Sequence, residues 1–413
     1  MHKKYKRNEL CRACKKHSFT KILDFGVSPP ANAFLTKVQL SRKESFFPLR
    51  VYICNSCHLV QLKDVVSPKL LFKKYVYVSS TSEVFINHFK KLAHQLTKKF
   101  KLNKKSLVID IGSNDGIFLK PFMTKKIKVL GIEPAINIAN MANGAGIETI
   151  SRFFSLSLAK QIRKKYGPAS IITATNVFAH INDLDEVIEG VRIMLSPMGV
   201  FIIEAPYLID FLRKNLFDTV YHEHLSYFSV FPLKILFERF KMKIFHVEKT
   251  YTHGGSLRIF ATVSSHIKRS SSVYKYLALE KKYKLNSLHT YKKFANRVEK
   301  NKQKLLTLLQ TLKSQNKTII GFGAPAKGNT LLNYFGITNK TLKYIVDDNH
   351  LKQGLYTPGT HIPIHSIQKL YEDKPDYILL LAWNFADSIM KKLQKYRNAG
   401  GKFIIPVPTP EIS

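Results

Sequence analysis

The sequence predicts an α/β protein with a doubly wound parallel sheet at its centre, flanked by a small metal-binding module and a smaller α/β domain. Between residues 107 and 204, apolar runs of strand length alternate with segments of helical spacing. All four cysteines precede that region, in two closely spaced pairs. After it, a second pattern of strand, glycine-rich loop and helix begins near residue 318. These three observations indicate several globular parts in one chain.

Length and charge narrow the class of protein. The 413 residues exceed one ordinary core, and no apolar run approaches the ~20 residues that span a membrane. The basic N-terminus leads into a cysteine rather than an apolar segment. We therefore expect a cytoplasmic protein, a monomer without a membrane partner. The net charge of +38 raises the possibility of nucleic-acid binding, but lysines occur in every segment, which favours a compositional bias.

The cysteines form two C-x-x-C knuckles, whose thiolates suit a closed tetrahedral zinc site. The four predicted ligands are Cys11, Cys14, Cys54 and Cys57. Disulfides are the alternative, which a cytoplasmic location disfavours. A site with four protein ligands leaves no open position for water, so the metal should stabilise the fold and take no part in chemistry. His17 and His58 stand beside the knuckles and could replace a ligand.

An aromatic and polar stretch follows this module. Tyr75 and Tyr77 precede a run of serine and threonine over 79–82, and helical spacing extends from Val84 to Phe100. A serine–threonine cluster before a helix usually caps that helix. The two tyrosines could instead face a binding site, and the spacing alone leaves both interpretations open.

The central sheet should begin with a strand over 107–111, which leads into a glycine-rich turn and a helix. The next strand ends in Glu133, an acid well placed to accept hydrogen bonds from two ribose hydroxyls. Dinucleotide dehydrogenases place a pyrophosphate on such a turn. Here, Asp110 and Asp115 would repel a pyrophosphate but suit the cationic sulfonium and the amino group of S-adenosylmethionine. The turn resembles the first motif of class I methyltransferases, and a turn without a ligand is the alternative.

The fourth strand begins at Ser170 and runs into a loop with Asn176 and His180, at the same edge of the sheet as the glycine turn. The residues expected to line the S-adenosylmethionine site are Asp110, Gly112, Ser113, Asn114, Asp115, Gly116, Glu133, Pro134 and Asn176. After a fifth strand over 200–204, the motif Tyr221-His-Glu-His224 places a histidine beside an acid, which suits proton abstraction. Chance clustering and weak metal binding by the two histidines are the alternatives.

The last third contains a lysine-rich helical stretch over 271–313 and a second strand–loop–helix unit. In its loop, Lys327 stands on a glycine-rich turn at a helix N-terminus, which suits a phosphate. We divide the chain into a zinc-binding module, a methyltransferase domain, a helical connector and a C-terminal Rossmann-like domain. Their expected boundaries are 1–70, 71–265, 266–315 and 316–413.

In their order along the chain, these motifs resemble the sugar C-methyltransferases that act on nucleotide-linked keto-deoxyhexoses, as in 3-C-methylation of dTDP sugars. The resemblance rests on the knuckles and on Tyr75-x-Tyr77, Gly112-Ser-Asn-Asp-Gly116, Glu133-Pro134, Asn176-x-x-x-His180, Tyr221-His-Glu-His224, Gly254-Gly-Ser-x-Arg258 and Gly321-x-Gly-x-Pro-Ala-Lys-Gly-Asn329. It implies structural zinc, S-adenosylmethionine, and a nucleotide-sugar between the central and C-terminal domains. The catalytic residues that it implies are Tyr75, His180, Tyr221, Glu223 and His224. The residues assigned to substrate binding are Tyr77, Ser256, Arg258, Lys327 and Asn329.

The implied reaction methylates a carbon next to a ketone, C-3 of a dTDP-4-keto-deoxyhexose, for branched-sugar or surface-polysaccharide biosynthesis. His224 would remove a proton to form an enolate, and Glu223 would orient or polarise that histidine. Tyr221 and His180 could hydrogen-bond the developing oxyanion. A zinc-knuckle nucleic-acid-binding protein with a vestigial cofactor domain is the competing hypothesis, and it predicts salt-sensitive binding to DNA or RNA. Methylation of another carbon acid and a dehydrogenase are the other enzymatic alternatives.

Overall fold

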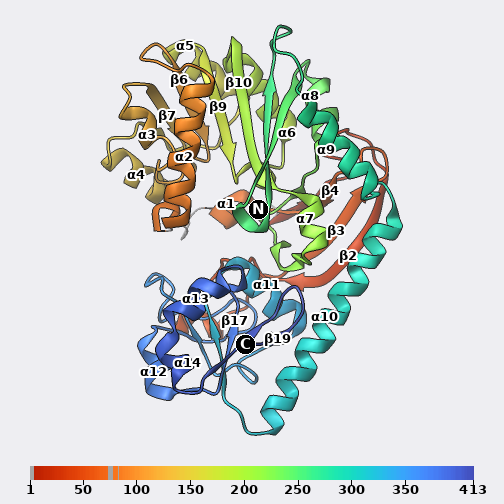
Figure 1. Ribbon diagram of the computed structural model, residues 1–413, viewed down its shortest axis with the longest axis vertical. Helices are drawn as coiled ribbons and strands as arrows, with labels where there is room; N and C mark the ends of the chain where they lie inside the picture. The colour runs from red at the N-terminus through yellow and green to blue at the C-terminus, as the bar shows by residue number, and fades with distance from the viewer. Residues whose placement is uncertain (1–3, 73–77, 82) are drawn as a thin grey trace.

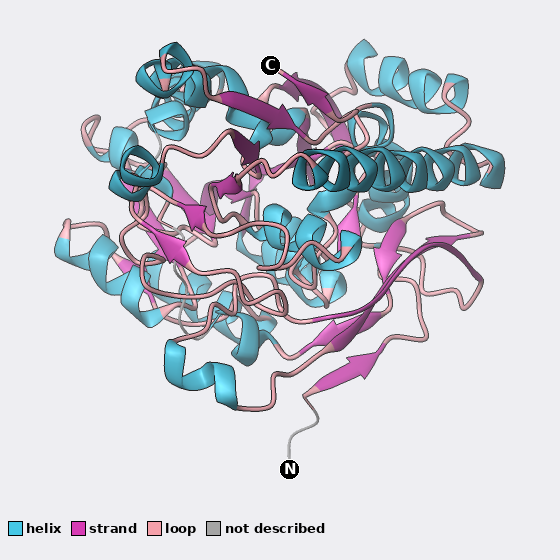
Figure 2. Cartoon of the chain, turned by 90° about the horizontal axis from the view of Figure 1, so that it is seen from below, coloured by secondary structure: helices cyan, strands magenta, loops and turns pink. Residues whose placement is uncertain are grey.

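The computed structural model describes residues 4–72, 78–81 and 83–413. The chain forms two lobes that are bridged along one side by the long helix α10 (Leu288–Ser314), with N-terminal strands running between them (Figure 1). Seen from below, the long curved strands of the N-terminal sheet lie along one side of the molecule (Figure 2). Two of the predicted site residues, Tyr75 and Tyr77, lie outside the described residues.

The N-terminal part is built on a four-stranded sheet in the order β11-β4-β3-β2. Its strands are β2 (Phe19–Ser28), β3 (Phe47–Cys54), β4 (Val60–Leu62) and β11 (Ser226–Tyr227). A separate antiparallel pair joins β1 (Tyr5–Arg7) to β5 (Asp64–Val66), and a short helix α1 (Pro68–Phe72) follows. Strand β11 belongs to the middle of the chain and pairs antiparallel with β4. The N-terminal sheet therefore holds the segment that directly follows the Tyr221–His224 motif.

The upper lobe contains a seven-stranded sheet in the order β12-β13-β10-β9-β6-β7-β8. Strands β6 to β10 run parallel, and β13 pairs antiparallel with both β10 and β12. The strands are β6 (Leu107–Ile111), β7 (Lys128–Ile132), β8 (Thr149–Ile150), β9 (Ala169–Thr175), β10 (Leu195–Pro206), β12 (Lys243–Thr250) and β13 (Ser256–Thr262). The doubly wound sheet predicted from the alternating pattern is confirmed.

Helices cover both faces of this sheet, which explains the nearly continuous apolar sequence of its central strands. The helices are α2 (Glu83–Lys99), α3 (Lys120–Met123), α4 (Ile136–Gly144), α5 (Leu156–Tyr166), α6 (Leu184–Met194), α7 (Leu208–Arg213), α8 (Val230–Arg239) and α9 (Ser271–Lys282). Successive residues of β6 enter two different cores. Val108 packs with the phenylalanines of α2 and α3, whereas Ile109 packs with the apolar faces of α5 and α6.

The lower lobe contains a six-stranded sheet in the order β16-β15-β14-β17-β18-β19. Its strands are β14 (Ile319–Phe322), β15 (Ile345–Val346), β16 (Ile364–His365), β17 (Tyr377–Leu380), β18 (Lys402–Ile405) and β19 (Glu411–Ile412). Its helices are α11 (Ala326–Phe335), α12 (Gln368–Asp373), α13 (Ala386–Lys392) and α14 (Gln394–Asn398). All pairs except β18–β19 are parallel. The loops before α11 and after β17 lie at one edge of this sheet, because both follow the carboxyl ends of parallel strands.

The N-terminal part touches both lobes. The rings of Phe25 and Tyr334 lie 4.4 Å apart between their centroids, and Leu35 and Tyr356 exchange two backbone hydrogen bonds.

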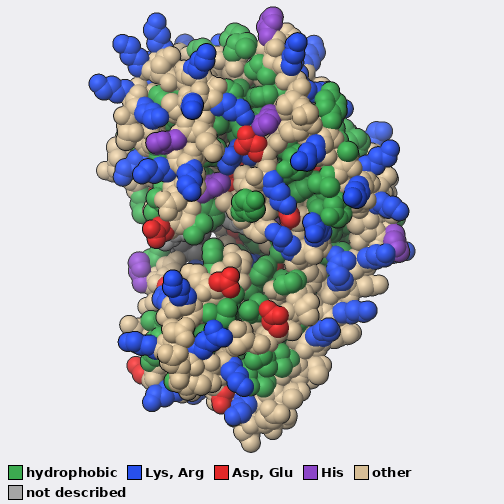
Figure 3. All heavy atoms as spheres, viewed as in Figure 1, with side chains coloured by type: hydrophobic (Ala, Val, Ile, Leu, Met, Phe, Trp, Pro, Cys, Tyr) green, Lys and Arg blue, Asp and Glu red, His purple; other side chains and the backbone are tan. Residues whose placement is uncertain are grey.

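Figure 3 shows a hollow between the lobes on the visible face, and lysine and arginine side chains spread over both lobes rather than gathering in one patch. None of the described helices combines the length and the apolar character of a membrane span.

Candidate active site

The four predicted zinc ligands come together. Their Sγ atoms all lie within 4.8 Å of one another, and the closest pairs, Cys11–Cys57 and Cys14–Cys54, are 3.5 and 3.6 Å apart. These separations are too long for a disulfide and suit the edges of a tetrahedral zinc–thiolate site. The donor set therefore fits zinc, and this is the one group of three or more metal-binding side chains among the described residues.

A buried arginine inside the first knuckle links this cysteine cluster to the middle of the chain. The Arg12 guanidinium donates to the carbonyls of Leu62 and Leu225, at 2.5 and 3.3 Å, and to the side chain of Asn182 at 3.1 Å. Burial lowers the pKa of Arg12 to about 10. Leu225 stands between the Tyr221–His224 motif and β11, so the knuckle fixes the chain one residue beyond His224.

The glycine-rich turn after β6 has the geometry of a ligand-binding loop. Gly112 has φ of 71°, and a Cβ there would come within 2.7 Å of Val177. Gly131 was not anticipated from the sequence, yet a Cβ there would meet the side chains of Ser113 and Thr149 at 2.6 Å. Both glycines let neighbouring strands and the turn approach closely.

Glu133 lies at the end of β7, as predicted, and faces the turn. Its carboxylate accepts from the backbone N–H groups of Asn114 and Ala135, at 3.1 and 2.9 Å. Burial raises the pKa of Glu133, and these two donors oppose that rise. Each carboxylate oxygen retains a lone pair, so Glu133 fits the predicted role of a ribose acceptor.

The serine-rich segment after Tyr77 contacts the glycine turn. The backbone N–H groups of Ser79 and Ser80 donate to the side chains of Asn114 and Asp115, at 2.8 and 3.2 Å. The serine-rich run thus contacts the cofactor turn. Asp115 Oδ1 and Asn176 Oδ1 are buried and have no hydrogen-bond partner among the described residues. These unsatisfied acceptors fit the amino group and hydroxyls of S-adenosylmethionine.

Asp110 occupies a different environment from the one that the sequence suggested. It is 2% exposed and accepts a hydrogen bond from Thr173 of β9 at 2.5 Å. Burial raises the pKa of Asp110 to about 7. In this structure the side chain joins two central strands, and direct contact with the cofactor stays a prediction.

The Tyr221–His224 motif forms a compact hydrogen-bonded unit. His224 Nδ1 lies 2.8 Å from the carbonyl oxygen of Thr219, and Nε2 lies 2.7 Å from the Tyr221 hydroxyl. Because a carbonyl can only accept, Nδ1 carries the proton, and the Nε2 lone pair accepts from Tyr221. The ring of His180 lies 4.9 Å from that of His224 and also stacks on Phe72. The structure thus brings three of the predicted catalytic side chains together: His180, Tyr221 and His224.

Glu223 does not orient His224, which corrects our prediction. Its carboxylate is 3% exposed and accepts from Asn32 Nδ2 at 2.9 and 3.1 Å, while the carbonyl of Thr219 holds the histidine. Burial raises the pKa of Glu223 to about 7. Asn32 lies 191 residues away in the chain, so no local pattern could have indicated this contact. Neighbouring His222 is buried against the Phe47 carbonyl, which gives it a structural contact.

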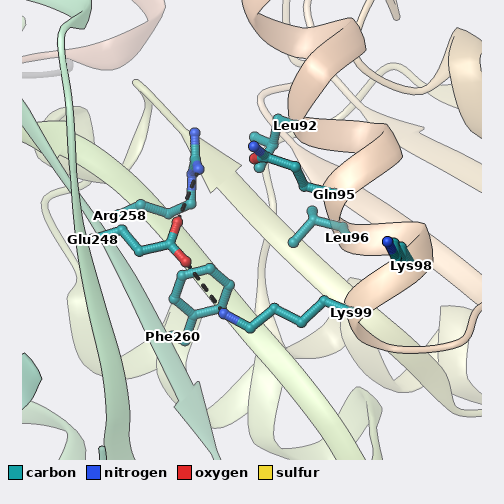
Figure 4. A pocket seen from close by; sticks show the side chains of 8 residues that line it. All are labelled: Leu92, Gln95, Leu96, Lys98, Lys99, Glu248, Arg258 and Phe260. Atoms are coloured by element: carbon teal, nitrogen blue, oxygen red, sulfur yellow. Dashed lines mark hydrogen bonds and ion pairs between the residues drawn. The ribbon is translucent and has the colours of Figure 1, made fainter. Parts of the chain in front are cut away.

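Two residues assigned to substrate binding, Ser256 and Arg258, contact other residues of the protein in this structure. Ser256 is fully buried and donates to the Thr252 carbonyl at 3.1 Å. Arg258 is paired with two carboxylates, Glu204 at 2.9 Å and Glu248 at 3.2 Å. Figure 4 shows Arg258 and Glu248 on one wall of a cavity of about 630 Å³ between α2 and the β12–β13 strands. Their contact with substrate stays a prediction, and the sequence does not reveal that Glu204 and Glu248 already pair with Arg258.

The remaining two substrate residues lie at the edge of the lower sheet. The Lys327 ammonium lies 4.4 Å from the centroid of the Trp383 ring and contacts the side chain of Asn384. Burial lowers the pKa of Lys327 to about 8, against the opposing charge of Asp218. Asn329 is 1% exposed and donates to the Ala31 carbonyl at 2.7 Å, so its amide nitrogen joins the lower lobe to the N-terminal part.

Comparisons with known families match nearly the whole chain. A zinc binding domain model matches residues 11–72, a methyltransferase domain model residues 85–247, and a C-methyltransferase C-terminal domain model residues 251–408. The chain is 36% identical over 404 residues to C-methyltransferase NovU of Streptomyces niveus, which covers 97% of this chain and 96% of that protein.

Solved structures match less than half of the chain, at lower identity. Magnesium protoporphyrin IX methyltransferase (ChlM) from Synechocystis PCC 6803, with bound SAH, is 13% identical over 43% of this chain and 83% of that chain, with a TM-score of 0.35. The PH0226 protein from Pyrococcus horikoshii OT3 is 15% identical over 45% of this chain and 94% of that chain, with a TM-score of 0.36.

Replacing Cys14 with serine should lower the bound zinc and the melting temperature together, because a structural zinc site contributes its binding free energy to folding. Metal analysis of the purified protein and thermal denaturation measure both. The control is His17→Ala, an exposed position beside the same knuckle, which should change neither quantity. Wild-type protein without zinc, or a Cys14→Ser variant with wild-type zinc and stability, would contradict the assignment.

Replacing Glu223 with glutamine should stabilise the protein increasingly as the pH rises. Because the folded-state pKa of Glu223 is raised to about 7, the protonated carboxyl favours folding, and its contribution is lost as the pH rises through that value. The glutamine variant has no such loss. Its free energy of unfolding should therefore exceed that of wild type by an amount that grows between about pH 5 and pH 8, to about 3 kcal/mol. Urea unfolding across that range measures it. Exposed Glu372→Gln should show no such trend, and neither would Glu223→Gln if the carboxylate were solvated.

Proposed function

Because the chain belongs to the C-methyltransferase family, whose members use S-adenosylmethionine, we propose that it methylates a nucleotide-linked 4-keto-deoxyhexose at the carbon next to the ketone. The nucleotide is dTDP and the carbon is C-3. The observation that carries this proposal is the hydrogen-bonded unit of Thr219, His224 and Tyr221, with His180 beside it. It offers a neutral base and two groups able to hydrogen-bond an oxyanion, which is what enolate chemistry requires.

In the proposed reaction, His224 Nε2 accepts the proton from C-3, and the electrons of the broken C–H bond form an enolate with the 4-ketone. The Tyr221 hydroxyl now bonds to Nε2, so it must pass its hydrogen bond to the ketone oxygen when the substrate enters. This exchange frees Nε2 and places a donor on the developing oxyanion. The Thr219 carbonyl then stabilises the imidazolium through Nδ1.

S-adenosylmethionine supplies an electrophilic methyl group on a sulfonium. The residues that would hold it are the glycine turn with Asn114 and Asp115, Glu133 for the ribose, and Asn176 at the end of β9. Their side chains are acidic or neutral, which favours a cationic ligand. The unsatisfied buried oxygens of Asp115 and Asn176 support this assignment.

Incubation with dTDP-4-keto-6-deoxyglucose and S-adenosylmethionine carrying a ¹³C-methyl group should yield a product that is heavier by one labelled methyl, located by NMR on C-3. Mass spectrometry detects the gain, and calorimetry with S-adenosylhomocysteine shows that the cofactor site is intact. Binding of S-adenosylhomocysteine without methylation of keto-sugars on any common nucleotide would reject this substrate class. It would favour another carbon acid.

The His224→Ala variant should lose turnover by a factor of roughly 10²–10⁴, the usual contribution of a general base. Without S-adenosylmethionine, wild type should exchange the C-3 proton for solvent deuterium, and the variant should not. His289→Ala, at an exposed position of α10, is the matched control and should keep both activities. If His224→Ala exchanges the proton as fast as wild type, the base is another residue.

The Lys327→Ala variant should raise the KM for the sugar nucleotide by roughly tenfold to hundredfold, the range expected when one charged hydrogen bond is removed. Its affinity for S-adenosylhomocysteine should stay the same, because Lys327 lies in the lower lobe. Lys343→Ala, an exposed lysine of the same lobe, is the control. Equal losses for both ligands would show that the change disturbs the fold rather than a diphosphate contact.

A further inference from the structure

A hydrogen bond connects the lower lobe to the turn that holds His224. Trp383 follows β17 and donates its indole N–H to Asp218 Oδ2 at 2.6 Å. Asp218 belongs to the short 3-10 turn Phe217–Thr219 of the upper lobe. The next residue is Thr219, whose carbonyl accepts from His224 Nδ1. One peptide unit therefore separates the contact between the lobes from the group that orients the proposed base.

Asp218 is held by groups of the lower lobe together with backbone N–H groups of its own turn. It has no exposed surface, and its Oδ1 is buried without a hydrogen-bond partner among the described residues. Burial raises the pKa of Asp218, and the charge of Lys327 and the indole N–H of Trp383 oppose that rise. A buried carboxylate is costly unless it is paired. Trp383 and Lys327 of the lower lobe therefore supply part of what stabilises a charge on Asp218 inside this turn.

A second contact links the lower lobe to Glu223, the neighbour of His224, in a similar way. Asn329 of α11 donates to the carbonyl of Ala31 at 2.7 Å, and the next residue, Asn32, donates to Glu223. Both Glu223 and His224 are thus held by groups that lie one residue from a contact with the lower lobe. One contact comes from the segment after β17, and the other comes from helix α11, which also carries Lys327.

We propose that Asp218 is a positioning residue for the methyl transfer, and that Trp383 acts through it to set the orientation of His224. The lower lobe then does more than bind the nucleotide. Its contact with the turn Phe217–Thr219 fixes the position of the Thr219 carbonyl. This carbonyl accepts from Nδ1 of His224 and so keeps Nε2 directed at the substrate. The inference rests on the proposed role of His224 as the base.

The test uses Asp218→Asn, which keeps the shape and removes the charge, and Trp383→Phe, which keeps the ring and removes the N–H. For each variant, the rate of C-3 deuterium exchange on dTDP-4-keto-6-deoxyglucose should fall by roughly ten- to hundredfold, as expected when a base is misplaced. The KM for the sugar and the affinity for S-adenosylhomocysteine should change little. The double variant should lose no more than the more impaired single variant, because both changes weaken the same charged hydrogen bond.

The matched control is Asn301→Ala, which removes another buried hydrogen-bonded link, from α10 to the carbonyls of Pro406 and Pro408 at 3.0 and 2.9 Å. It should lower the melting temperature and leave the exchange rate intact. Wild-type exchange in both Asp218→Asn and Trp383→Phe would overturn the proposal. Losses that multiply in the double variant would overturn it as well. If wild type itself fails to exchange the proton, the proposed function is wrong, which is a separate result.

Discussion

The hydrogen bond between His224 Nδ1 and the Thr219 carbonyl is the constraint on which the rest of the site depends. It fixes the proton on Nδ1 and leaves Nε2 as the acceptor, which a base needs. The bond joins two residues five positions apart, in the segment between the turn Phe217–Thr219 and strand β11. Neither end of this loop is held by its own lobe alone: Trp383 of the lower lobe contacts Asp218, and the N-terminal sheet pairs with β11. The geometry of one imidazole ring thus depends on all three parts of the chain.

This arrangement gives the zinc-binding part a role that requires no chemistry at the metal. The knuckle residue Arg12 donates to the Leu225 carbonyl, just beyond His224, and Asn32 holds Glu223. A closed four-cysteine site is rigid, and rigidity is what a supporting contact to a catalytic loop needs. The upper sheet supplies the cofactor turn, and the N-terminal part holds the catalytic loop against the same edge.

The sequence predicted those features whose physical signal is local. The glycine turn before Glu133, the cysteine pairs and the long helix α10 depend on residue type and spacing, and the structure contains all of them. The contact of Arg258 with Glu204 could not be predicted, because a glycine turn followed by an arginine looks the same whether its partner is a substrate or a buried acid. The contact of Asn32 with Glu223 joins distant parts of the chain, so only the fold reveals it. Tyr75 and Tyr77 stay predictions, since they lie outside the described residues.

The most direct test of this account is the protonation of His224 itself. ¹⁵N NMR of histidine-labelled protein, with the His224 signals identified by their absence from the His224→Ala spectrum, distinguishes the two neutral tautomers and the imidazolium. The account predicts that the neutral ring carries its proton on Nδ1 and leaves Nε2 unprotonated. A proton on Nε2 of the neutral ring would contradict it.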